Sequence, residues 1–278
     1  LTRRVRENAD SVATIRRHFA MKNTMGYGVN AFLDFERPVD VLAHLIIGSE
    51  GTLAFVAEAT FRTVPIKPHV STALAVFPTL AEAPSALPAL LETGAATLEL
   101  MDSTSIRVGQ SLPEPPAQIR GIEVGEKAAL LIEYHAGRQA ELDELVAGGR
   151  RLLGELPLVG PADLSGEARA RSLAWAFRKG LYASVAGARP SGTTALLEDI
   201  VVPVPALAAT CGDLHTLFER YQYRDSVIFG HAKDGNIHFM LTDRFESGDS
   251  LQRLVAFTDD MVDLVLGAGG NLKAEHGT

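Results

Sequence analysis

The sequence predicts an α+β protein in which helices pack on one face of an antiparallel sheet, the arrangement called ferredoxin-like. From about residue 70 onward, segments with strand character alternate with segments that have the apolar spacing of helices. Strand–helix–strand units that return to neighbouring positions favour an antiparallel sheet. Pro65, Pro68 and His69 interrupt the pattern, so we expect two domains, residues 1–67 and 68–278.

In the first of these domains, the sequence predicts two helices, a loop and a strand. Residues 3–20 have apolar residues spaced by three and four, as an amphipathic helix requires. A glycine-containing loop follows, and Pro38 then suits the first turn of a helix that ends at Gly48. Residues 53–65 are rich in β-branched and aromatic side chains, which predicts a strand.

In the second domain, the sequence predicts alternating strands and helices. The expected strands are residues 71–77, 97–102, 128–135, 194–202 and 226–230. The expected helices are residues 80–93, 138–156, 166–185, 205–221 and 251–270. A hairpin directly follows the strand at 226–230, so we expect the polar residues of this hairpin to lie in the sheet.

Composition excludes several classes of function. The 278 residues carry a formal net charge of −8, whereas nucleic-acid binding needs a concentrated excess of Lys and Arg. Cys211 is the single cysteine, and an iron–sulfur cluster takes about four, so this chain is expected to hold neither a cluster nor a disulfide. No apolar run reaches the roughly 18 residues of a membrane span. We expect a cytoplasmic protein, with peripheral attachment to a membrane left open.

The most informative segment is the hairpin SVIFGHAKDGNIHFMLT. Asp234-Gly235 between two apolar runs is a strong signal for a two-residue type I′ turn. In that register His231 faces His238, with Cβ atoms roughly 4.5–5.5 Å apart. Two imidazoles at this distance can bind one metal ion, although core histidines that share a hydrogen bond are the alternative.

A third ligand is expected from the end of the chain. The predicted helix 251–270 would carry the chain back across the sheet and deliver Glu275 and His276 near the hairpin. Glu275 is the candidate third metal ligand and His276 the candidate base, because imidazole suits proton transfer near neutral pH. Taken alone, a terminal Glu-His pair is more often part of a solvated tail than of a site.

A glycine-rich loop precedes the strand predicted at 53–65. P-loops and dinucleotide fingerprints run from a strand through glycines into a helix, so the order found here excludes both. Taken alone, the loop at residues 48–52 is best interpreted as a glycine-rich turn before a strand.

Four separated segments match motifs of one known family. They are KNTMGY (22–27), GSEGTLAFVAEATFRTVP (48–65), GHAKDGNIH (230–238) and KAEHGT (273–278). These segments resemble the KNTxGY loop, the GSEGTLG(I/V)xTE(A/V)xLRxxP stretch, the GHxGDGNxH hairpin and the GEHG element of the FAD-linked oxidase C-terminal domain family. D-lactate, glycolate and D-2-hydroxyglutarate dehydrogenases belong to this family. The likeness extends in order over almost the whole chain.

The resemblance implies a different role for each of the two domains. Residues 1–67 would be the C-terminal half of a PCMH-type FAD-binding domain, and residues 68–278 a substrate or cap domain truncated at its C-terminal end. The sequence starts at Leu1 rather than Met and stops just after the last motif, as an excised fragment would. The nearest subgroup is the large fused enzymes with a further iron–sulfur domain, so electrons would leave through a missing domain or a partner.

Matching each position to the family's motifs implies specific roles. The implied ligands of a divalent metal ion, Zn²⁺ or Mn²⁺, are His231, His238 and Glu275. The implied catalytic residues are the base His276, the carboxylate-binding Arg178, the polar group Asn236, and Tyr182, where some members have threonine. The implied FAD contacts are Asn23, Thr24, Gly26, Tyr27, Gly48, Ser49, Glu50, Gly51, Thr52 and Val56.

The implied reaction is oxidation of a D-2-hydroxy acid, of the D-lactate or D-2-hydroxyglutarate type, to the 2-oxo acid with hydride transfer to FAD. Leu197 stands where some members have a substrate-binding lysine, and Lys233 replaces the usual glycine of the hairpin. Because of both departures, the sequence does not identify the chemical group at the far end of the substrate. Two alternatives are a flavin oxidase or synthase acting on a non-acid substrate, and a ferredoxin-like binding module without catalysis.

Overall fold

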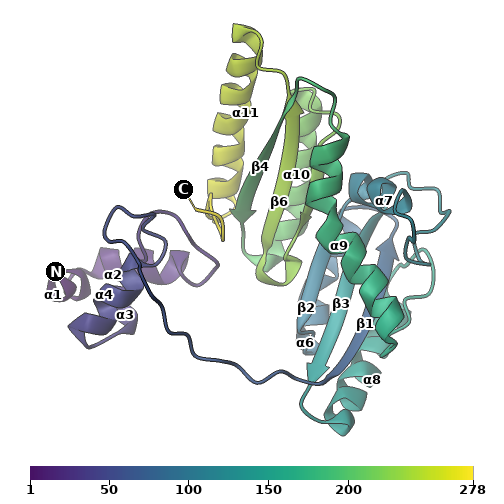
Figure 1. Cartoon of the computed structure of the whole chain (residues 1–278), viewed down its shortest axis with the longest axis horizontal. Helices are drawn as coiled ribbons and strands as arrows, with labels where there is room; N and C mark the ends of the chain where they lie inside the picture. The colour runs from purple at the N-terminus through teal and green to yellow at the C-terminus, as the bar shows by residue number, and fades with distance from the viewer. Residues whose placement is uncertain (278) are drawn as a thin grey trace.

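The computed structural model describes residues 1–277; Thr278, the end of the second predicted domain, lies outside the described residues. Within this range six antiparallel strands form one sheet in the order β1-β3-β2-β5-β6-β4. Figure 1 shows helices packed against this sheet, with the N-terminal helices joined to β1 by a long extended segment. The predicted α+β class with an antiparallel sheet is confirmed.

The sheet is built from two units with the same order of elements. The first unit contains β1 (His69–Phe77), α5 (Glu82–Ser85), α6 (Leu87–Glu92), β2 (Thr97–Met101), β3 (Ala128–Ala136) and α8 (Gln139–Glu155). The second contains β4 (Thr194–Val201), α10 (Leu207–Arg220), β5 (Val227–Gly230), β6 (Asn236–Asp243) and α11 (Gly248–Gly267). In each unit the last strand lies between the first two, and β2 pairs with β5 where the units meet. The β5–β6 hairpin therefore lies beside β2.

Two local details differ from the predicted helices of the first unit. The helix predicted over 80–93 is divided into α5 and α6, because Pro88 in the first turn of α6 has no backbone N–H to continue a helix. A further helix, α7 (Ser103–Gln110), was not predicted. Its N-terminus is capped by Asp102, whose Oδ1 accepts the N–H of Ser105 at 2.8 Å.

Helices cover both faces of the sheet, so the prediction of helices on one face alone is wrong. Leu130 of β3 belongs to the core under α5, α6, α8, α10 and α11, whereas its neighbour Leu131 belongs to the core under α7 and α9 (Ala168–Ala188). Strands buried on both faces carry continuous apolar runs, as β3 does. Among residues 1–277, no helix combines the length and the apolar character needed to cross a membrane.

The N-terminal region has a small core of its own. The helix predicted over 3–20 is divided into α1 (Thr2–Arg6) and α2 (Ala9–His18), because the Asn8 side chain accepts the N–H of Ser11 and starts a new helix. A short helix, α3 (Ala31–Asp34), lies within the predicted loop, and α4 (Pro38–Ile46) forms as predicted. The buried side chains of this core are Ala31, Phe32 and Val41.

The strand predicted over 53–65 does not form in the structure. This segment is extended, but no described strand pairs with it. Its large apolar side chains lie in solvent, with Phe55 91% and Phe61 84% exposed. A strand requires a neighbour to satisfy its backbone N–H and C=O groups, and β-propensity cannot replace that neighbour. The division at residue 67 and the assignment of this region to a PCMH-type domain stay predictions.

Candidate metal and substrate site

The turn between β5 and β6 differs from the predicted two-residue hairpin. Ala232–Asp234 forms a 3₁₀ turn, and Gly235 follows it in the left-handed region with φ of 69°. Because this turn is longer, Phe229 rather than His231 pairs with His238, and the predicted register is wrong. His231 reaches the same point from beyond the end of β5. Its ring lies 5.4 Å from that of His238, centroid to centroid, at 90°.

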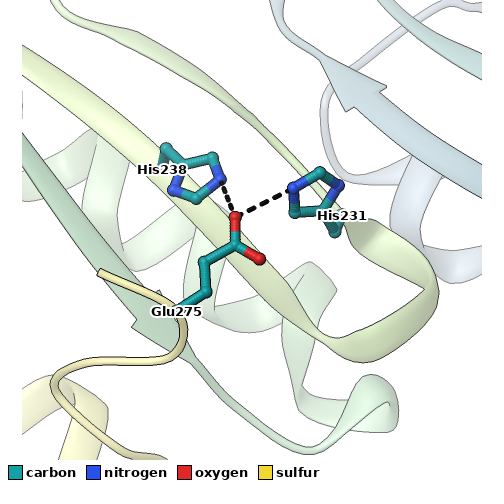
Figure 2. A group of neighbouring side chains, drawn as sticks. All are labelled: His231, His238 and Glu275. Atoms are coloured by element: carbon teal, nitrogen blue, oxygen red, sulfur yellow. Dashed lines mark hydrogen bonds and ion pairs between the residues drawn. The ribbon is translucent and has the colours of Figure 1, made fainter. Parts of the chain in front are cut away.

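A carboxylate lies between the two imidazoles. Glu275 Oε1 is 3.0 Å from Nε2 of His231 and 3.2 Å from Nε2 of His238, as Figure 2 shows. One potential ligand atom from each residue lies within 4.8 Å of the other two. Two imidazoles and one carboxylate are a known ligand set for Zn²⁺ and similar ions. Because both histidines direct the same ring nitrogen to one point, these side chains fit a divalent metal ion.

Asp199 of β4 holds the segment that carries Glu275. Its Oδ2 accepts three consecutive backbone N–H groups at 2.7–2.9 Å, from Ala274, Glu275 and His276. Its Oδ1 accepts the Asn236 amide at 2.7 Å and lies 3.3 Å from His238 Nδ1. Burial raises the pKa of Asp199, but His238 and these N–H groups lower it well below the usual range. The charged carboxylate therefore fixes the terminal segment against β6.

The N-terminal region contributes a cation to the same place. Lys22 Nζ lies 3.1 Å from Glu275 Oε2 and 3.1 Å from Asp234 Oδ2. Burial raises the pKa of Glu275, but the hydrogen bond from Lys22 and the nearby histidines lower it below its usual value. The Thr24 hydroxyl donates to the backbone carbonyl of His276. Segments more than two hundred residues apart in the chain thus meet at the candidate site.

A buried ion pair lies behind His231. Helix α9 brings Arg178 to β2, where its Nε donates to Glu99 Oε2 at 2.8 Å, and its guanidinium lies 5.0 Å from the ring centroid of Phe229. Glu99 Oε1 is 2.8 Å from His231 Nδ1 and raises the pKa of His231 despite burial. Within residues 1–277 the Arg178 side chain forms hydrogen bonds through Nε alone. Its two terminal nitrogens are therefore available for an anion.

The other predicted catalytic residues occupy different positions. The His276 ring stacks on His238 with centroids 4.9 Å apart and planes at 7°. Asn236 is fully buried, and its amide donates to Asp199 and to the Ile200 carbonyl, so it supports Asp199 rather than an open surface. Tyr182, one helical turn after Arg178, is 51% exposed. His276 thus lies beside the His231–His238 pair, whereas Tyr182 is exposed on α9.

The residues predicted to contact FAD lie mostly in two loops. Residues 23–27 form one loop and residues 48–52 the other, and Val56 lies in the extended segment. The loops touch, because the Thr52 hydroxyl donates to the Tyr27 hydroxyl at 3.0 Å. Glu50 lies so close to Gly277 that a side chain at position 277 would collide with it. The predicted flavin loops therefore lie beside the segment that carries Glu275, and their roles in FAD binding stay predictions.

The glycines of these loops are required by backbone conformation. Gly26, Gly48 and Gly51 have φ of 66°, 77° and 80°, in the left-handed region that favours glycine. A Cβ atom at any of the three would meet no atom within 4 Å. The space beside these glycines is therefore open, as a cofactor-binding loop requires.

Two acidic residues of the site were missed by sequence reasoning. Glu99 is 5% exposed and Asp199 is fully buried, and each lies in a strand segment rich in apolar residues, LELM or LLEDIV. A buried carboxylate needs partners to offset the loss of hydration. An acidic residue at an inward-facing strand position is therefore the sequence signal that could have identified both.

Residues 66–278 match the family model for FAD linked oxidases, C-terminal domain, and the chain belongs to this family. It is similar to the glycolate oxidase subunit GlcD of Bacillus subtilis (strain 168), with 28% identity over 85% of the chain and 48% of the relative. It is also similar to a D-lactate dehydrogenase of Anaerostipes hadrus, with 25% identity over 85% of the chain and 50% of the relative.

Solved structures agree on the fold. An alkyldihydroxyacetonephosphate synthase superposes with a TM-score of 0.61 at 17% identity, over 84% of the chain and 45% of that structure. The 4-ethylphenol oxidase from Gulosibacter chungangensis superposes with a TM-score of 0.53 at 13% identity, over 78% of the chain and 47% of that structure. The chain spans about half the length of the relatives it matches.

Proposed function

We propose that the full-length protein containing this chain oxidises a D-2-hydroxy acid to the 2-oxo acid, with FAD and a divalent metal ion such as Zn²⁺ or Mn²⁺. The observation that carries this proposal is the position of the Glu275 carboxylate between the Nε2 atoms of His231 and His238. The substrate class is supported by the names of two relatives, a glycolate oxidase subunit and a D-lactate dehydrogenase.

Each cofactor has candidate residues in the chain. His231, His238 and Glu275 would hold the metal ion, and the loops at 23–27 and 48–52 would contact FAD. When bound, FAD supplies a hydride acceptor and the metal ion a Lewis acid that makes the substrate hydroxyl more acidic. Electrons would then pass to iron–sulfur centres in a further domain or to a partner.

The remaining side chains bind the substrate and move its proton. Arg178 binds the substrate carboxylate through its terminal nitrogens, for which the planar guanidinium is suited. His276 takes the hydroxyl proton at a ring nitrogen, since neither of its ring nitrogens forms a hydrogen bond within residues 1–277. Asn236 acts through Asp199, and Tyr182 borders the substrate from α9.

The apolar surroundings of one position favour a particular hydroxy acid. Leu197 of β4 is half-buried and packs against the core under α9. It offers no charge for a second carboxylate at the far end of a substrate. We therefore propose a D-lactate-type substrate with a short or apolar side chain in preference to a D-2-hydroxyglutarate type.

The test is a substrate panel with the FAD-loaded full-length protein and an artificial electron acceptor. D-lactate, L-lactate, glycolate and D-2-hydroxyglutarate are compared before and after removal of metal with a chelator. We expect D-lactate to be oxidised fastest, the rate to fall on chelation, and Zn²⁺ or Mn²⁺ to restore it. Turnover of non-acid substrates only would favour a flavin oxidase or synthase. Absence of turnover in the FAD-loaded protein would favour a binding module.

A further inference from the structure

Glu99 contacts both Arg178, which is proposed to bind the substrate carboxylate, and His231, which is proposed to bind the metal ion. Its Oε2 accepts from Arg178 Nε at 2.8 Å, and its Oε1 lies 2.8 Å from His231 Nδ1. The Glu99 side chain is 7% exposed and that of Arg178 is 10% exposed, so water contributes little to the contact between them. Both oxygens are therefore committed to one partner each, one on the substrate side and one on the metal side.

The contact with His231 determines which ring nitrogen is free. A neutral imidazole carries hydrogen on one nitrogen and a lone pair on the other, and the lone pair is needed to bind a metal ion. His231 directs Nε2 toward Glu275, so Nδ1 must carry the hydrogen and must have an acceptor. Glu99 Oε1 is that acceptor. A carboxylate behind a metal-binding histidine fixes both the ring orientation and the tautomer.

The contact with Arg178 orients the guanidinium in the same way. Because Glu99 binds Nε and neither terminal nitrogen forms a hydrogen bond within residues 1–277, both terminal nitrogens are left for another anion. The Phe229 ring beside the guanidinium limits its movement further. One carboxylate thus holds the Arg178 fork and the His231 ring in a fixed relation to each other.

We propose that Glu99 is a positioning residue that couples carboxylate binding at Arg178 to metal binding at His231. The proposal rests on the proposed function, since it concerns the same metal ion and the same class of substrate. Glu99 touches neither of them and acts through its two neighbours.

The sharpest variant is Glu99→Gln. A glutamine has one acceptor oxygen and one donor nitrogen, so it can satisfy Arg178 or His231 but not both. The matched control is Glu133→Gln. Glu133 is also a buried glutamate of the same sheet, and it pairs with Arg171 of α9 rather than with a residue of the site.

The experiment measures metal affinity without turnover. The full-length wild-type, Glu99→Gln and Glu133→Gln proteins are stripped of metal and titrated with Mn²⁺ and with Zn²⁺. We expect Glu99→Gln to raise the metal Kd by about 10–100-fold, as loss of such a supporting carboxylate does. Glu133→Gln should keep the wild-type Kd. With saturating metal, Glu99→Gln should also raise the KM for D-lactate, because Arg178 is no longer fixed.

The outcomes separate this proposal from the one it rests on. A wild-type protein that binds neither ion overturns the metal site and the role of Glu99 with it. If the wild type binds and Glu99→Gln binds equally well, the role of Glu99 alone is wrong. If Glu99→Gln does not fold, Glu99→Asp decides, because it keeps two acceptor oxygens but withdraws them by one methylene group. An unchanged Kd in that variant also overturns the proposal.

Discussion

Two buried glutamates on the sheet, Glu133 and Glu99, pair with arginines of the same helix. The two pairs differ in how many nitrogens of the arginine bind the carboxylate. Arg171 of α9 binds Glu133 through Nε at 2.8 Å and through a terminal nitrogen at 3.0 Å. Arg178, seven residues later, binds Glu99 through Nε alone. The first arginine gives the carboxylate a bidentate contact, whereas the second retains its terminal nitrogens.

The surroundings of the two carboxylates differ in the same way. Glu133 also accepts hydrogen bonds from Thr72, Trp175 and His135, all of which belong to the protein. Among residues 1–277, Glu99 has His231 as its one further partner, and that histidine faces Glu275. These partners of Glu133 lie outside the candidate site, so we expect their contacts to stabilise the fold. The Glu99 cluster is open toward other groups, so the same buried ion pair can serve binding.

Replacing a histidine in each cluster should give the largest contrast. We expect His231→Ala in the full-length protein to abolish metal binding and to lower the rate at least about 100-fold, since a bound metal ion contributes several kcal/mol to such reactions. His135→Ala removes the histidine beside Glu133 and should leave both unchanged. Elemental analysis of the purified variants and steady-state rates measure the two effects.

His276→Ala sharpens the same contrast within the site. The His276 side chain stacks on His238 but lies outside the group formed by His231, His238 and Glu275. This variant should therefore keep its metal and lose turnover. Full metal content and normal rates in His231→Ala would mean that His231 is a core histidine and that the site is misassigned.

Sequence patterns predicted most elements of the sheet because those elements are specified locally. The strands from β1 to β5 have the apolar runs expected of buried strands, and their bounds were predicted to within a few residues. β6 was expected as the second arm of the hairpin. The segment 53–65 has the same composition but forms no strand, because pairing depends on a neighbour that local composition does not specify.

The site was predictable where residues carry an explicit signal. The convergence of His231, His238 and Glu275 follows from the hairpin and the terminal segment, although the register was wrong. A Gly in the left-handed region can end a three-residue turn as well as a two-residue one, and the letters Asp-Gly do not distinguish them. Glu99 and Asp199 depend on contacts between distant strands, which periodicity alone does not reveal.

The Glu133 cluster should appear in the pH dependence of stability. Burial raises the pKa of Glu133, but hydrogen bonds from Arg171, His135, Thr72 and Trp175 outweigh it and lower the pKa from 4.5 to about 2. The folded state therefore holds this proton less tightly than the unfolded state. The resulting stabilisation, on the order of 3 kcal/mol, is complete above about pH 4.5 and is lost as the pH falls toward 2.

Urea unfolding at a series of pH values measures this contribution. Glu133→Gln should be less stable than the wild type at neutral pH, and the difference should shrink between about pH 4.5 and pH 2. A difference that stays constant over this range would show that the Glu133 charge does not stabilise the fold. The contacts of Glu133 would then be no evidence of a stabilising role for this carboxylate.

The smallest expected effect compares the two arginines directly. Lysine keeps the positive charge but cannot offer the planar fork of arginine. In the full-length protein, Arg178→Lys should lower kcat/KM for the hydroxy acid by an amount worth about 1–3 kcal/mol, because carboxylate binding loses its bidentate geometry. Arg171→Lys should lower the free energy of unfolding and leave kcat/KM unchanged, since in the described part of the chain the Arg171 guanidinium binds Glu133 and no residue of the site. Equal kcat/KM values for the two variants would remove Arg178 from the substrate site and would leave both arginines as structural partners of buried glutamates.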